Sequence, residues 1–182
     1  HDAISGAQLV PLLTAVVSAD SDLIGGAMRV LADPRRGPER YSNHRPCEAL
    51  ERWLDPYHTT TERVFGALGE AESWLAEASL TVGQRTVIDA LVRALMRRVV
   101  ATTYADGVRL VFQHQTVPAS VAWLQVRDRA VRLVACALEH DDPLVRHLAV
   151  SLHYDLGETY GTRVDLSPEV ESDTAKHAES LL

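Results

Sequence analysis

Apolar residues recur at helical spacing in successive segments of this 182-residue chain, and this period most constrains its fold. The clearest stripe follows Thr60 and comprises Val64, Phe65, Leu68, Ala71, Leu75 and Ala78. A second stripe follows the capping-box spacing of Thr81 and Gln84, at Val87, Ile88, Leu91, Val92, Leu95 and Val99. A helix with one apolar stripe must bury it against another element. The sequence therefore predicts a mainly α fold of stacked antiparallel helical pairs.

Caps and breaks predict five further helices, each delimited by Pro, Gly or Asp. They cover about 5–17, 23–31, 47–54, 118–140 and 143–157. In the first helix, Pro11 introduces a kink or marks a later start. Gly157 ends the last helix. The stretch 99–112 is β-branched and carries an Asp106-Gly107 turn, so a β-hairpin competes there with a resumed helix. We expect one helical domain over 1–157, with sub-units 1–33, 46–99 and 118–157. An acidic, peripheral C-terminal segment follows at 158–182.

The charge balance narrows the classes of partner. The formal net charge is −7, which argues against a nucleic-acid-coating role, because such binding needs a concentrated basic patch. The most apolar stretch, Leu9 to Val17, is too short to span a membrane. Cys47 and Cys136 form no CxxC pair and fit small buried residues. The chain opens at His1, so we expect an excised piece of a larger, bacterial-type cytoplasmic protein that needs no cofactor.

One passage resembles a known repeat family. Asp142-Pro143-Leu144-Val145-Arg146 and Ala149 follow the pattern D-P-x-V-R-x-x-A, and Arg127 and Arg129 lie on the preceding predicted helix. This segment, about 124–157, resembles the HEAT/armadillo α-helical repeats. The resemblance implies a solenoid in which Arg146 lies at an inter-repeat edge and pairs with the preceding Asp. An irregular helical bundle is the alternative architecture.

A second resemblance points to catalysis. His140-Asp141 is similar to the dyad of HD-domain phosphohydrolases, which implies a divalent metal held by His114, His140, Asp141 and Asp155. This sequence departs from the family pattern where Pro118 interrupts the helix and where Asp142-Pro143 follows the dyad. The favoured interpretation of the same residues is a helix C-terminus with a cationic His followed by a capping Asp.

The leading functional hypothesis is a noncatalytic helical interaction, scaffold or regulatory domain that binds a protein partner or flanking domains. Its predicted surface is an Arg-rich loop together with the arginines of the repeat-like segment, since Arg and Tyr are enriched at interface hot spots. The candidate residues are Arg35, Arg36, Arg40, Tyr41, His44, Arg127 and Arg146. A metal-dependent HD-type phosphohydrolase and a helical nucleic-acid-binding module are the alternatives.

Overall fold

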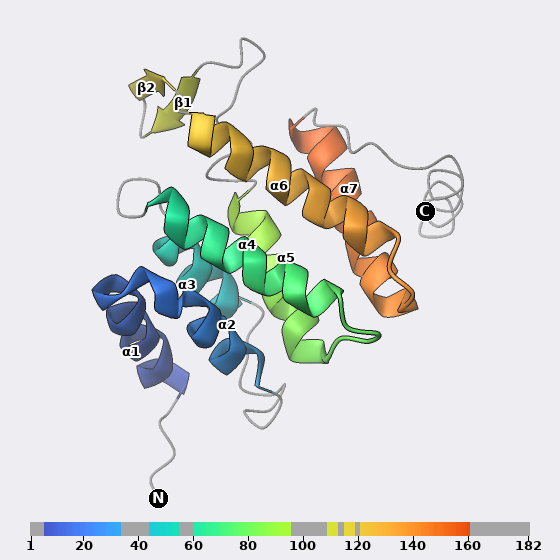
Figure 1. The fold of residues 1–182 in the computed structure, drawn as a ribbon, viewed down its shortest axis with the longest axis horizontal. Coiled ribbons are helices and arrows are strands. Elements are labelled where there is room, and N and C mark those ends of the chain that lie inside the picture. Colours follow the sequence, from blue (N-terminus) through green and yellow to red (C-terminus); the bar gives the residue numbers. More distant parts are fainter. Residues whose placement is uncertain are drawn as a thin grey trace, which may run out of the picture.

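The computed structural model describes residues 6–33, 44–54, 60–95, 109–112, 115–118 and 121–160. Over these residues the chain is mainly helical, as predicted. The α-helices are α1 (Gly6–Ala19), α2 (Ile24–Ala32), α3 (His44–Trp53), α4 (Thr61–Leu75), α5 (Val82–Leu95), α6 (Val121–Leu138) and α7 (Pro143–Tyr160) (Figure 1). A single 3₁₀ turn, η1 (Ser21–Leu23), leads into α2.

The starts of α4 and α5 confirm the caps expected from the sequence. Thr60 Oγ1 accepts a hydrogen bond from the Arg63 amide at 3.4 Å. At the start of α5 the Thr81 amide donates to Gln84 Oε1 at 2.8 Å, and the Gln84 amide donates to Thr81 Oγ1 at 3.2 Å. This reciprocal pair is a capping box, which satisfies two amides that have no partner within the helix.

The helices pack in two rows. α2, α4 and α6 contact one another in succession, and so do α3, α5 and α7. α4 and α5 form one helical hairpin, and α6 and α7 form another, with α1 at the opposite end of the molecule from α7 (Figure 1). Each hairpin buries its apolar stripes against the neighbouring hairpin, which is how stacked helical pairs build a continuous core.

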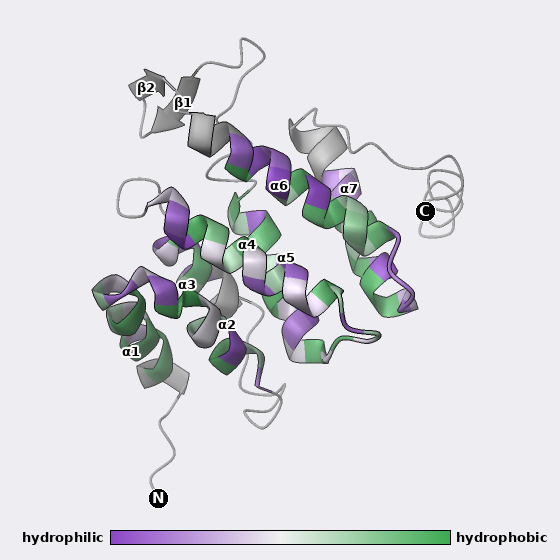
Figure 2. Ribbon diagram, in the orientation of Figure 1, coloured by the Kyte–Doolittle hydropathy of each residue, from purple (hydrophilic) through white to green (hydrophobic). Residues whose placement is uncertain are grey.

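The core lies between the two rows and contains the stripes that the sequence predicts. Hydrophilic and hydrophobic residues alternate along α4 and α6, as expected of helices buried on one side (Figure 2). The largest side chains with less than 2% exposure are Trp53, Ile24, Met28, Leu50, Leu54, Leu68, Ile88, Leu91, Leu95, Leu133 and Leu152.

Glycines mark two places where helices approach closely. A methyl group on Gly25 of α2 would lie 2.9 Å from the carboxylate of Glu70 on α4. That carboxylate accepts two hydrogen bonds from Arg29, Nε to Oε1 at 2.6 Å and Nη2 to Oε2 at 2.7 Å. At the start of α5, a methyl group on Gly83 would lie 2.7 Å from the carbonyl carbon of Ala32. The C-terminal end of α2 therefore abuts the N-terminal end of α5. This contact is favourable because the negative end of one helix dipole lies beside the positive end of the other.

Several predicted boundaries were wrong. α1 is an exception, because it begins at Gly6 as predicted and runs through Pro11, which is tolerated since Pro11 lies on the exposed side, where water can satisfy the carbonyl it leaves unpaired. Ala78 lies beyond the end of α4 and is exposed. Pro118 ends a β-strand rather than starting α6, and Gly157 lies inside α7, which continues to Tyr160.

The described β-strands lie at the end of the predicted hairpin segment and just beyond it. Strand β1 (Arg109–Phe112) pairs antiparallel with β2 (Gln115–Pro118), with Leu110 opposite Val117. β1 pairs with residues that follow it in the chain, whereas the expected partner segment, 99–103, lies outside the described residues. Residues 99–103 and the Asp106-Gly107 turn lie outside the described residues, as do most of the predicted segment 158–182 and Cys47's side chain.

Candidate functional site

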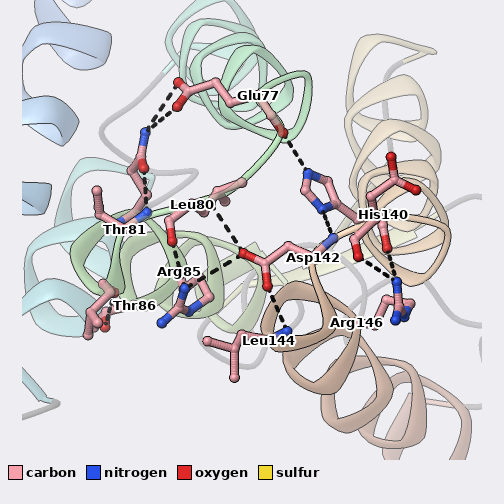
Figure 3. A network of polar contacts seen from close by, with 12 residues as sticks. Glu77, Leu80, Thr81, Arg85, Thr86, His140, Asp142, Leu144 and Arg146 are labelled. Atoms are coloured by element: carbon pink, nitrogen blue, oxygen red, sulfur yellow. Dashed lines mark hydrogen bonds and ion pairs between the residues drawn. The ribbon is translucent and has the colours of Figure 1, made fainter.

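The His140-Asp141 pair lies in the turn between α6 and α7, against the turn between α4 and α5. His140 is buried, with 8% of its surface exposed. Its Nδ1 accepts a hydrogen bond from the Asp142 amide at 2.9 Å, and its Nε2 lies 2.9 Å from the carbonyl oxygen of Glu77 (Figure 3). Because Nδ1 accepts, the ring proton is assigned to Nε2, which donates to Glu77. In this arrangement the ring is a neutral tautomer, and both of its nitrogens form hydrogen bonds to backbone groups. The expectation of a cationic His at this helix end was wrong.

Asp142 connects the two hairpins through its carboxylate. Oδ1 accepts from the Leu144 amide at 2.8 Å and so caps α7, while Oδ2 accepts from the Leu80 amide at 3.4 Å. The Arg85 guanidinium lies 4.0 Å from Oδ2. The hydrogen bond from Leu144, with further contributions from Leu80 and Arg85, holds the pKa of the Asp142 carboxyl below its ordinary value of 3.8. The capping residue is thus Asp142, one position after the Asp141 that the sequence interpretation indicated.

The parallel direction of α5 and α7 explains why an anion belongs between them. Leu80 and Arg85 at the start of α5 meet Asp142 at the start of α7, and Arg93 near the end of α5 bonds to Asp155 of α7. Two parallel helices place their positive N-terminal ends side by side, which is unfavourable without a compensating negative charge. The Asp142 carboxylate supplies that charge to both ends.

Arg146 closes the same turn from the α7 side. Its Nη1 donates to the carbonyl oxygens of His140 at 2.6 Å and Asp141 at 2.8 Å. These carbonyls lie just beyond the end of α6, where helix C-terminal oxygens have no partner within the helix. The resemblance led us to expect Arg146 to pair with the carboxylate of a preceding Asp, but it bonds to backbone oxygens instead. We call this set of contacts the hairpin junction; it comprises Glu77, Leu80, Arg85, His140, Asp142 and Arg146.

The remaining members of the hypothetical metal site lie apart from His140 or outside the described residues. Asp155 is ion-paired with Arg93 and lies twelve residues after Pro143, which is about 18 Å along the axis of α7. Asp141 is exposed, and His114 lies outside the described residues. Among the residues that the structure describes, no group of three or more His, Cys, Asp or Glu side chains is arranged to hold a metal ion.

Two arginines of α6, Arg127 and Arg129, bind neighbouring acidic groups. Arg127 donates from Nε and Nη2 to Oδ1 of the adjacent Asp128, at 3.0 and 2.9 Å. Arg129 makes two hydrogen bonds to the Glu72 carboxylate, at 2.6 and 2.5 Å, and its guanidinium lies 5.6 Å from the centre of the Phe65 ring. Glu72 raises the pKa of Arg129 through the hydrogen bond. Arg129 thus ties α6 to α4 rather than presenting a free charge.

The Arg-rich loop falls in the gap before α3. Arg35, Arg36, Arg40 and Tyr41 lie outside the described residues, and His44 is the first residue of α3. Of the predicted partner-binding residues, the structure brings only Arg146 into the hairpin junction, while Arg127 lies on α6.

A groove between α5 and α7 is the feature that sequence reasoning missed. Its volume is about 430 Å³, and Val82 and Leu144, at the starts of the two helices, are 64% and 55% exposed. Other residues lining the groove are Arg85, Thr86, Asp89, His147, Leu148 and Ser151. The only sequence signal was an apolar residue in the first turn of each helix, ahead of the buried stripe.

Comparisons of the chain with protein-family models, with curated proteins and with solved structures find no match. None of the helices in the described ranges is both long and apolar enough to cross a membrane.

Proposed function

We propose that this chain is a noncatalytic helical protein-interaction domain, and that its binding surface is the groove between α5 and α7. The observation that carries the proposal is the pair of large apolar side chains, Val82 and Leu144, exposed at one end of that groove. Exposed apolar residues around a concavity are characteristic of sites that bind another molecule.

The groove is braced at both ends by contacts between its own walls. Asp142 links the starts of α5 and α7, and Arg93 of α5 bonds to Asp155 and to Ser151 of α7, the latter at 3.3 Å. Arg93 Nε also donates to Asp89 at 2.9 Å. A surface held in place before binding loses little conformational entropy when a partner docks.

The size and chemistry of the groove favour a short apolar segment of a protein. Residues 82–89 and 144–151 each span seven residue steps, about 10 Å along their helices, which matches roughly two turns of a helical ligand. The charged side chains on the walls are already paired, Arg85 with Asp142 and Asp89 with Arg93. We therefore expect the occupant to be a helix that presents two or three apolar side chains and no charge to the groove.

The stacked hairpins support the scaffold interpretation. The D-P-x-V-R segment, Asp142 to Arg146, begins α7 after the turn that follows α6, and its Asp142 also contacts Leu80 in the turn before α5. Membership of that repeat family stays a prediction, as do the cytoplasmic setting and the bacterial origin. The Arg35–His44 surface also remains a proposal, to be tested by changing Arg35, Arg36 and Arg40 to Ala in the binding experiment below.

The test is selection of peptides from a displayed random library on the immobilised whole chain, followed by affinity measurement on variants. Leu144→Asp removes the apolar wall, and because an acidic residue in a first helical turn is favourable, this variant should fold normally. Leu23→Asp is the control, since Leu23 is 46% exposed on η1 and does not line the groove. We expect the selected peptides to bind Leu144→Asp at least tenfold more weakly and Leu23→Asp unchanged. Peptides that bind all three proteins equally, or a library that yields no binder, would overturn the proposal.

A further inference from the structure

The outward face of α1 is apolar and carries no charge. The whole helix, GAQLVPLLTAVVSA, contains no acidic or basic residue. Leu9, Leu13 and Val17 face the core, whereas Leu12 and Val16 are 49% and 36% exposed. Pro11, Ala15 and Ala19 are also exposed, so the outer surface of the helix is largely hydrophobic, with Ser18 as an exposed but uncharged polar residue. Figure 2 shows this as a predominantly green helix at one end of the molecule.

The opposite side of α1 is fixed to the domain by a buried polar contact. The Trp53 indole Nε1 donates to Thr14 Oγ1 at 2.9 Å, and Thr14 Oγ1 donates to the Val10 carbonyl at 2.7 Å. Trp53 is 1% exposed. This contact sets the rotation of α1 about its axis, so the apolar outer face is a property of the folded domain.

The side chains of this face form a ridge beside a trough. Residues four apart align along a helix surface, so Leu12 and Val16 form a raised row. The adjacent row consists of Pro11, Ala15 and Ala19, whose side chains are short, and it forms a shallow trough parallel to the ridge. When two such faces meet across a two-fold axis, the ridge of each fits the trough of the other.

We propose that a second copy of this chain is the occupant of this face, and that two α1 helices pack through it as a symmetric dimer. A two-fold interface requires a surface that is complementary to itself. The ridge and trough meet that requirement in shape, and the absence of charge removes like-charge repulsion at the contact. The chain as a whole carries −7, so two copies repel each other where charged surfaces meet. The dimer is reversible, because a 14-residue helix offers less area than a standard stable interface.

Sedimentation velocity of the whole chain over a concentration series tests the proposal. We expect the weight-average mass to rise from 20.0 kDa toward twice that value as concentration increases. Leu12→Glu places a charge on the ridge, and Ala15→Leu fills the trough without adding charge. Both substitutions are at exposed positions, so far-UV circular dichroism should match the parent, and each variant should remain a monomer at concentrations where the parent dimerises.

Leu144→Asp is the matched control, since it alters the groove between α5 and α7 and should dimerise like the parent. A parent chain that stays monomeric at every concentration would overturn the dimer. So would dimers that persist in both Leu12→Glu and Ala15→Leu, or association that continues beyond two copies. The dimer uses a different helix from the proposed peptide groove, so either proposal can fail while the other stands.

Discussion

The close approach of α5 to α2 at Gly83 leads to the sharpest stability prediction. A methyl group at this position would lie 2.7 Å from the carbonyl carbon of Ala32, 3.0 Å from its Cα and closer still to its oxygen. These are backbone atoms at the end of a packed helix, so Gly83→Ala must push α2 and α5 apart. Overpacking of this kind costs about 1–3 kcal/mol, whereas Ala in a helix gains at most about 1 kcal/mol over Gly.

Gly26 provides the matched control for the same chemical change. It lies in α2, is exposed, and has no heavy atom within 4 Å of the position that a methyl group would occupy. Gly26→Ala should therefore raise the free energy of unfolding by about 0.5–1 kcal/mol. Gly83→Ala should lower it by up to about 2 kcal/mol, which is the overpacking cost of up to about 3 kcal/mol less a gain of about 1 kcal/mol in helix propensity.

Urea unfolding followed by far-UV circular dichroism would measure both values in the whole chain. The comparison is internal, because each variant replaces one helical glycine by alanine and leaves the charge unchanged. The steric reasoning fails if Gly83→Ala is as stable as the parent or more stable. It also fails if Gly26→Ala destabilises the fold to the same extent.

Three further outcomes are expected. The pKa of Asp142 is lower in the folded chain than its ordinary value, so its carboxylate stabilises the fold above about pH 4. That stabilisation is lost as pH falls through the folded pKa. Asp142→Asn should therefore reduce the loss of stability between about pH 5 and pH 2, as measured by thermal unfolding. The Glu70 side chain is 7% exposed and Arg29 is 68% exposed, so Arg29→Met should cost about 1–2 kcal/mol by leaving a buried carboxylate unpaired, and adding Glu70→Gln should recover part of that loss in urea unfolding. Thr14→Val should cost about 1–2 kcal/mol because the buried Trp53 indole loses its acceptor, whereas Thr14→Ser should stay near the parent; equal unfolding midpoints for the two would contradict this.

Local features of the fold were predictable because they depend on residues close in sequence. The capping box at Thr81 and Gln84 needs only a spacing of three residues, and the structure contains both of its hydrogen bonds. The buried positions of α5, such as Val87 and Leu91, follow from the helical period alone.

Apolar runs without a period led to error. Val134 to Leu138 are five consecutive apolar residues, and successive residues of a helix are about 100° apart, so such a run covers every side of the helix. Val134, Ala137 and Leu138 are buried, whereas Cys136 is exposed, contrary to the prediction of a buried thiol. The sequence of such a run does not determine which of its residues face the neighbouring helix.

The candidate sites depended on contacts that no local pattern specifies. His140 was noticed as half of a dyad, but its partner is the backbone carbonyl of Glu77, 63 residues earlier. The exposure of Leu144 is set by the spacing between α5 and α7, two helices that are distant in sequence. Long-range packing decides both, and period and capping signals carry no information about it.

The sharing of Asp142 between the two hairpins has a consequence for how the domain comes apart. Detaching α6 and α7 strips the Leu80 amide of its acceptor and the Glu77 carbonyl of its donor, in the turn ahead of α5. Detaching the α6–α7 hairpin therefore also costs its neighbour two hydrogen bonds. Native-state hydrogen exchange should find the amides of α5 and α7 opening together, as one cooperative unit rather than in sequence from the end of the array.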